Sequence, residues 1–188
     1  WNGTSWTEVN DVNTARRGTG GAGTVTTAGL IFGGATPSIT DATETYDGTS
    51  WAETNNLNTA REDVFQGIGS QAAGQCAGGA PPPSAGLNEI WDGTSWTESA
   101  DLNAAGTAGG GSGTSTASMV FGNPSTRTET WNGTSWTEVA DVATGRSLGG
   151  STTGSTTVSA MYCGGSPNTT ASEEWSDPVY TIKTVTTS

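Results

Sequence analysis

The segment Trp1-Asn2-Gly3-Thr4-Ser5-Trp6-Thr7-Glu8 opens the chain and decides its fold, because the chain repeats it. It returns at 46–53, 91–98 and 131–138, and a shortened copy lies near the C-terminus at 173–176. The leading aromatic residues of successive copies are 40–45 residues apart. Self-similarity at such a fixed period indicates a chain built from repeated supersecondary units that stack on one another.

Other motifs keep the same phase. An Asp-Val/Leu-Asn-x-Ala-Arg pattern recurs in outline at 11–16, 56–61, 101–106 and 141–146. An apolar run that ends in glycine recurs at 30–34, 76–79, 119–122 and 161–165. An acidic residue precedes each later leading aromatic by two positions, at Glu44, Glu89, Glu129 and Glu173. Each unit therefore carries the same elements in the same order.

The unit has the size and the turn chemistry of one propeller blade with four strands. In the first complete unit we expect strands at Gly18–Thr24, Thr27–Gly33, Ala42–Tyr46 and Ser50–Thr54, with a hairpin turn at Asp47-Gly48. The prediction is an all-β propeller with four complete blades at 18–60, 61–105, 106–145 and 146–188. Residues 1–17 would form an N-terminal half-blade, and Val179–Thr186 would form a closing outer strand. Either upstream residues of a longer chain complete the half-blade, which we favour, or it docks on the last blade and closes the ring.

Composition excludes several classes of function. Only 31% of the 188 residues are apolar and 29 are Gly, yet the chain has 8 Trp, which a disordered chain would lack. A net charge of −12 argues against binding to nucleic acid. The absence of His removes imidazole catalysis and His-type zinc sites, and two Cys cannot build a Cys₄ site. We therefore expect no catalytic residue, no cofactor and no metal, and no apolar run suits membrane insertion.

The side chains that recur with the repeat are interpreted as structural. Small residues at 18–23 and 108–113 suit inner strands that converge on a narrow axis. The repeated acids, which also include Glu8, Glu53, Glu98 and Glu138, would face solvent or pair with Arg rather than bind metal. Arg16, Arg61 and Arg146 would pack over the neighbouring blade, the alternative being a ring of ligand-facing arginines. Cys76 and Cys163 are expected to be free thiols.

With these motifs the chain resembles the kelch-repeat β-propellers, whose blades carry a di-glycine, then an aromatic residue, then a Trp. The residues that carry the resemblance are Gly33, Gly34, Tyr46 and Trp51; Gly78, Gly79, Trp91 and Trp96; Gly122, Trp131 and Trp136; Gly164, Gly165 and Trp175; and Trp1 and Trp6 of the first copy. The third unit departs by its single glycine and by Gly106 in place of Arg, and the fourth lacks the second Trp. The amino-acid sequence of the repeat also looks like that of kelch-like proteins of marine tailed phages.

The connections between second and third strands differ among units, and each contains Pro. A rigid framework that carries variable loops on one side is typical of a binding module. The candidate ligand-binding residues are Thr36, Ser38, Pro82, Ser84, Asn123, Arg127, Asn168 and Thr169.

The resemblance implies a non-enzymatic, extracellular recognition module, part of a phage tail fibre or virion surface. Its partners would be a glycan or protein of the host cell surface and other virion proteins, and an oligomer is compatible with this role. One alternative is a purely structural virion or filament component. A second is a propeller glycosidase, which would need a carboxylate pair or a Tyr nucleophile in a pocket.

Overall fold

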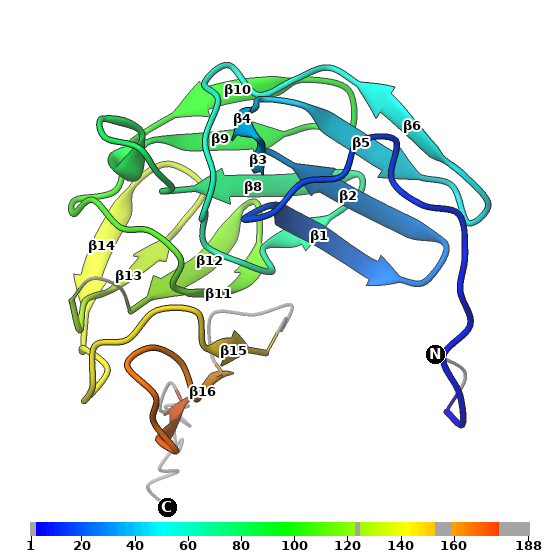
Figure 1. Ribbon diagram of the computed structural model, residues 1–188. Helices are drawn as coiled ribbons and strands as arrows, with labels where there is room; N and C mark the ends of the chain where they lie inside the picture. Colours follow the sequence, from blue (N-terminus) through cyan, green and yellow to red (C-terminus); the bar gives the residue numbers. More distant parts are fainter. Residues whose placement is uncertain (1–2, 123–124, 153–158, 177–188) are drawn as a thin grey trace, which may run out of the picture.

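The computed structural model describes residues 3–122, 125–152 and 159–176, and it is an all-β, four-blade β-propeller. Figure 1 shows the blades following one another in chain order along an arc. The first blade is the antiparallel sheet β1 (Gly20–Val25), β2 (Ala28–Phe32), β5 (Thr43–Tyr46) and β6 (Trp51–Thr54). The loop between β2 and β5 folds into the small hairpin β3 (Ala35–Thr36) and β4 (Ser38–Ile39).

The next two blades repeat this order of strands. The second contains β7 (Gly69–Ser70), β8 (Ala73–Ala77), β9 (Asn88–Trp91) and β10 (Trp96–Ser99), with the 3-10 turn η1 (Ser84–Gly86) in its loop. The third contains β11 (Gly110–Thr114), β12 (Ala117–Phe121), β13 (Thr128–Trp131) and β14 (Trp136–Val139). The fourth contains β15 (Gly150–Ser151), β16 (Ser159–Cys163) and β17 (Ser172–Ser176).

The predicted all-β propeller and its four blades are confirmed. Three strands of the first blade lie within the predicted ranges, and β1 extends one residue beyond its predicted end, to Val25. The expected closing strand Val179–Thr186 lies outside the described residues. The expected half-blade is wrong for the described part of the N-terminus, where residues 3–16 contain no strand. The reason is that an outer strand needs inner strands to pair with, and none of the four sheets includes this segment. Trp6 is accordingly 83% exposed.

The hydrophobic core is divided among the interfaces between successive blades. Leu30 and Phe32 of the first blade pack with Trp91 and Trp96 of the second. Equivalent clusters join the second blade to the third and the third to the fourth. The large aromatics in these clusters therefore stabilise a blade pair rather than one sheet, so a single unit cannot bury its own hydrophobic surface. Tyr46 and Trp51 of the first blade contact each other within one sheet.

The inner strands are rich in glycine for a reason that sequence alone did not reveal. Gly20 pairs with Phe32, and a Cβ at Gly20 would lie 2.2 Å from the Phe32 ring. Gly110 pairs with Phe121 and shows the same 2.2 Å approach. These glycines make room for an aromatic ring of the adjacent strand in the same sheet, in addition to any crowding at the axis.

In each of the first three blades, the hairpin turn is a four-residue loop rather than a two-residue turn. Tyr46 pairs with Trp51, which leaves 47–50 as the loop. Asp47 Oδ1 accepts hydrogen bonds from the backbone N–H groups of Thr49 and Ser50, both at 2.8 Å, and only Gly48 has positive φ. Asp92 and Asn132 accept the equivalent bonds in the next two blades. The repeated Asp or Asn is therefore a side-chain cap of the turn.

Candidate functional site

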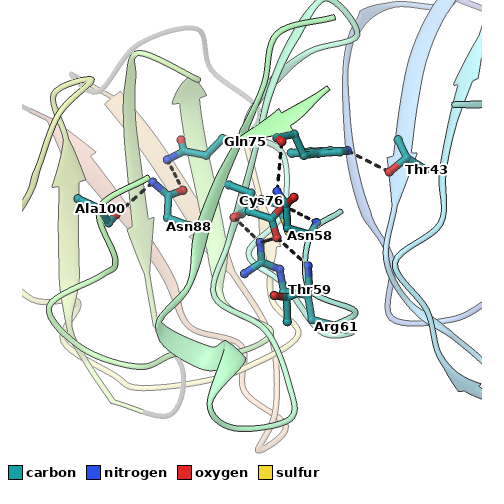
Figure 2. Close-up of polar contacts among 10 residues, drawn as sticks. Thr43, Asn58, Thr59, Arg61, Gln75, Cys76, Asn88 and Ala100 are labelled. Atoms are coloured by element: carbon teal, nitrogen blue, oxygen red, sulfur yellow. Dashed lines mark hydrogen bonds and ion pairs between the residues drawn. The ribbon is translucent and has the colours of Figure 1, made fainter. Parts of the chain in front are cut away.

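Beneath the loops between second and third strands lies a buried carboxylate, drawn for the second blade in Figure 2. Glu89 Oε2 accepts hydrogen bonds from the backbone N–H and the side-chain amide of Asn58, both at 2.8 Å. Its Oε1 accepts bonds from the Thr59 N–H at 3.3 Å and from Arg61 Nη2 at 2.7 Å. Both charged side chains are fully buried, so this ion pair fixes the connection from the first blade onto the second.

The first and fourth blades hold the same pair. Arg16 Nη2 donates to Glu44 at 2.7 Å, and Arg146 Nη1 donates to Glu173. The side chains of Arg16, Arg61 and Arg146 are 0% exposed, which rules out the alternative of a ligand-facing ring of arginines. Burial lowers the pKa of Arg16, against the opposing effect of Glu44 and Glu53. The buried arginine and the backbone N–H three residues before it, from Asn13, Asn58 or Ala143, therefore clamp each carboxylate between successive units.

The third blade keeps the carboxylate but lacks the arginine. Glu129 is 3% exposed and accepts bonds from Asn103 N, Asn103 Nδ2 and Ala104 N, at 2.8–2.9 Å. Gly106 stands at the arginine position, and a small cavity of about 10 Å³ lies between it and Glu129.

The glycines that end each second strand allow the next connection to approach the blade. A Cβ at Gly33 would lie 2.5 Å from the carbonyl oxygen of Arg61, and one at Gly78 would lie 2.4 Å from that of Gly106. The following glycines donate to the same carbonyls, Gly34 to Arg61 at 2.8 Å and Gly79 to Gly106 at 3.0 Å. The close approach of the backbone, together with positive φ, requires glycine at these positions.

Backbone hydrogen bonds place the variable loops at one end of the propeller. Arg17, Glu62 and Ser147, which precede the inner strands, bond with Ala35, Ala80 and Ser166, which begin the loops. We call the end formed by loops 35–41, 80–86, 125–127 and 166–170 the loop face. The turns at 47–50, 92–95 and 132–135 lie at the opposite end, because they close strands at the far end of the ladder.

The predicted ligand-binding residues lie on this loop face where they are described. Thr36, Ser38, Pro82, Arg127 and Asn168 are exposed. Thr169 is half-buried, and its hydroxyl accepts a hydrogen bond from Ala171 N. Asn123 and the side chain of Ser84 lie outside the described part of the molecule, as does Trp1 of the first repeat.

The sequence analysis did not predict a series of backbone hydrogen bonds that links the blades near the propeller axis, at the end of the loop face. Asp63 N donates to Gly18 O at 2.8 Å, Ala108 N to Asp63 O, and Leu148 N to Ala108 O. All four residues have φ between 52° and 62°, although three are not glycine. We call this chain of bonds the axial ladder. The signal in the sequence was Asp63, an acid at a position where the other units have Gly, Ala or Leu.

The axial ladder surrounds a cavity of about 250 Å³, which is lined by Gly18, Asp63, Gln66, Ala108, Gly109, Leu148 and Gly149. Asp63 and Gln66 supply its polar side chains. A wider cavity of about 620 Å³ lies at the opposite end, where Thr24, Ser70 and Thr114–Thr116 contribute hydroxyl groups. Both ends of the axis therefore offer a cavity with some polar side chains in its lining, and only one of the two is bordered by the variable loops.

The two cysteines are free, as expected, and differ in environment. Cys76 is fully buried, and burial raises the pKa of its thiol to about 12. Cys163 is half-buried.

Within residues 3–122, 125–152 and 159–176, no group of three or more His, Cys, Asp or Glu side chains could hold a metal ion. The described residues also contain no helix long and apolar enough to cross a membrane.

No protein-family model matches the chain, and no curated protein matches its sequence.

Proposed function

We propose that this chain is a kelch-like propeller that serves as a non-enzymatic recognition module, part of a phage tail fibre or another virion appendage. Its loop face would bind a glycan or a protein on the host cell surface, outside the cell, while other virion proteins hold the propeller in place. The kelch and phage assignments rest on the resemblance of the repeat motifs.

The observation that carries the proposal is the contrast between a repeated framework and unlike loops. Three blades hold the same Arg–Glu pair directly beneath the loops, and the connections there are bonded backbone to backbone. Above this framework one loop is a β-hairpin, β3–β4, and another contains the 3-10 turn η1. A rigid base lowers the entropic cost of binding, and diversity restricted to one end is the arrangement of a recognition surface.

The test is binding of the full chain to a glycan array and to intact host cells. Four single substitutions on the loop face are compared: Ser38→Ala, Pro82→Ala, Arg127→Ala and Asn168→Ala. If one of these side chains is an energetic centre of the interface, its removal weakens binding by roughly 30-fold. Matched controls are Thr49→Ala, Thr94→Ala and Thr134→Ala, which alter exposed side chains in the turns at the opposite end.

Two results would overturn the assignment of the loop face. Binding that is unchanged by every loop variant but lost with Thr24→Ala, Ser70→Ala or Thr114→Ala would move the ligand to the hydroxyl-lined cavity at the other end. Absence of binding to any glycan or cell, with these loops buried between subunits in the assembled particle, would instead favour a purely structural component.

A further inference from the structure

The cavity of about 250 Å³ inside the axial ladder, called here the axial cavity, presents hydrogen-bond acceptors. Asp63 and Gln66 are the polar side chains of its lining, and none of the described residues that line it is basic. An ionised carboxylate has acceptor atoms only. The Gln66 Nε2 atom already donates to the backbone oxygens of Thr19 at 2.8 Å and Val64 at 3.3 Å. Both amide hydrogens are therefore used, and Oε1 is the Gln66 atom that remains for a ligand.

The Asp63 carboxylate lacks a counter-charge. Its Oδ1 atom would lie 2.8 Å from a Cβ at Gly18, so the carboxylate stands at the wall of the cavity. The adjacent acid Glu62 pairs with Arg17 at 3.7 Å, but within the described ranges no ion pair or side-chain hydrogen bond involves Asp63. Asp63 is half-buried, and the chain carries a net charge of −12. A partly desolvated carboxylate in such a field favours a ligand that brings positive charge and N–H donors.

The side chains around the axis stand where the backbone favours glycine. Asp63, Ala108 and Leu148 have φ of 53°, 52° and 56°, and the equivalent residue of the first blade is Gly18, with φ of 62°. A left-handed φ is unfavourable for residues that carry a Cβ, although Asp tolerates it better than Ala or Leu. Glycine at all four positions would form the same backbone bonds without this cost. The axial ladder therefore does not by itself account for the side chains of Asp63 and Leu148.

Leu148 gives the axial cavity an aliphatic wall. Its side chain is 70% exposed, so it gains little from burial in the folded chain. Ala108 stands between Asp63 and Leu148 in the axial ladder, so the carboxylate and the aliphatic side chain contribute different parts of the lining. Residues held at an unfavourable φ often serve a ligand, and here they place a carboxylate and an apolar group around one cavity.

A primary ammonium group on an alkyl chain matches this lining. It has three N–H donors, a positive charge and no acceptor, whereas a neutral hydroxyl ligand would bring acceptors for which the cavity offers no free side-chain donor. We infer that the axial cavity binds a primary ammonium group on an unbranched alkyl chain, the chemistry of a lysine side chain. Asp63 and Gln66 Oε1 accept its N–H bonds, and Leu148 covers its methylene groups.

The experiment titrates n-butylammonium chloride into the full, ¹⁵N-labelled chain at constant ionic strength and follows the amide signals by NMR. Saturable shifts are expected for the Gln66 side-chain amide and for the backbone amides of Asp63, Ala108 and Leu148, with a Kd on the order of 1 mM. Tetramethylammonium carries the charge without N–H donors, and 1-butanol carries the alkyl chain without the charge. Both should bind at least about tenfold more weakly.

Variants at Asp63 test the carboxylate. Asp63→Asn keeps the shape of the side chain and should weaken the binding of butylammonium by about tenfold to 100-fold. Asp63→Gly introduces the residue of the first blade and relieves the unfavourable φ, so it should fold and show the same loss. The matched control is Asp101→Asn, which removes one exposed acid outside the cavity, beside Leu102, whose N–H binds Gly86 O of the loop face. This control should bind like the wild-type chain.

Leu148→Gly tests the aliphatic wall. This variant also relieves an unfavourable φ, so it should fold, and it should weaken the binding of butylammonium while leaving that of methylammonium unchanged. A residue with a purely structural role would not change the dependence on chain length. Nα-acetyl-lysine methylamide should bind like butylammonium, and methyl glucosaminide, whose ammonium group is attached to a ring carbon, should bind more weakly.

The proposal is overturned if butylammonium causes no saturable shift, or if Asp63→Asn and Asp101→Asn weaken binding equally, which would reduce the effect to net charge. Tighter binding of methyl glucosaminide than of the lysine derivative would give the cavity to an amino sugar and also exclude the alkyl chain. The inference does not rest on the function proposed for the loop face. Failure of the chain to bind cells or glycans would leave these titrations unaffected, and failure of the titrations would leave the loop variants to be judged by their own test.

Discussion

In the second blade Glu89 is bonded to Arg61, whereas in the third blade the equivalent Glu129 accepts its bonds, among the described residues, from Asn103 and Ala104. The two connections nevertheless follow equivalent backbone paths, since Arg61 O accepts a bond from Gly34 of the first blade and Gly106 O accepts one from Gly79 of the second. The comparison teaches that the path of the backbone is set by the glycines and by the amide donors around the carboxylate. The arginine side chain adds charge compensation to a connection that is already formed.

The largest expected difference concerns removal of the carboxylate charge. Glu89→Gln leaves the guanidinium of Arg61 buried without a counter-charge, and it should lower the free energy of unfolding by about 3–5 kcal/mol. Glu129→Gln leaves no buried charge behind, and its effect should be limited to weaker hydrogen bonds, about 1–3 kcal/mol. Urea unfolding of the two variants measures both values.

If Glu89→Gln does not fold, the double variant Glu89→Gln/Arg61→Met provides the comparison. It removes both charges, so it should be more stable than the single variant. Equal losses for Glu89→Gln and Glu129→Gln would show that the ion pair contributes nothing beyond the amide donors.

The second prediction restores the missing arginine. Gly106→Arg should place a guanidinium beside Glu129 and raise the free energy of unfolding by about 1–2 kcal/mol, since the carboxylate is already buried. Gly106→Met controls for side-chain bulk and for the loss of glycine flexibility in the unfolded chain. The gain should vanish in the background of Glu129→Gln, and a gain that persists there would assign it to packing.

The third prediction uses the cysteines as reporters of local opening. Cys163 should react with a thiol reagent in the native state roughly tenfold or more faster than Cys76, because burial raises the pKa of Cys76 to about 12 and closes access to it. Cys76 O also accepts a bond from Arg61. Glu89→Gln should therefore accelerate labelling of Cys76, while Glu129→Gln should not; mass spectrometry of the labelled peptides distinguishes the two sites.

The smallest expected effect concerns the hairpin turns. Hydrogen bonds from Ser50 and Thr49 hold the pKa of Asp47 below its ordinary value, and those from Ser95 and Thr94 do the same for the pKa of Asp92. A folded-state pKa below the unfolded one stabilises the fold above the unfolded value. That contribution is lost as the pH falls through the folded value. Asn132 makes the same turn in the third blade without a titrating group.

The variant Asp47→Asn/Asp92→Asn should therefore lose less thermal stability than the wild-type chain between about pH 4 and pH 2. Thermal unfolding midpoints across this range provide the measurement. Glu98→Gln, which removes an exposed carboxylate outside the turns, is the control. Identical pH profiles for wild-type chain and double variant would contradict a role of these carboxylates as turn caps.

Much of the fold could be predicted because the repeat reports it several times over. The copies of the Trp-x-Gly-Thr-Ser-Trp hairpin fixed the blade period, and the phase of the arginines placed them between blades. The candidate loops also followed from the alternation of strand direction. The half-blade predicted for the N-terminal repeat was wrong, because a segment with the sequence of a strand forms a strand only when it can pair with the edge of a sheet.

Part of the site could not be predicted, because it depends on contacts between units. Asp63 and Gln66 line the axial cavity only because inner strands from several blades converge there. The polar chain from Ser118 through Gln75 to Asn88 crosses from the third blade to the second, and nothing in the spacing of these residues indicates it. Side chains brought together from different repeats leave no local pattern.

The sequence by itself determined the blade, its period, its turns and the position of its clamp, because these arise from contacts that recur within one unit or between equivalent units. Only the tertiary structure decided that the arginines are buried and that glycines accommodate a neighbouring ring or carbonyl. Those properties depend on distances between residues far apart in the chain, and packing rather than local preference sets such distances.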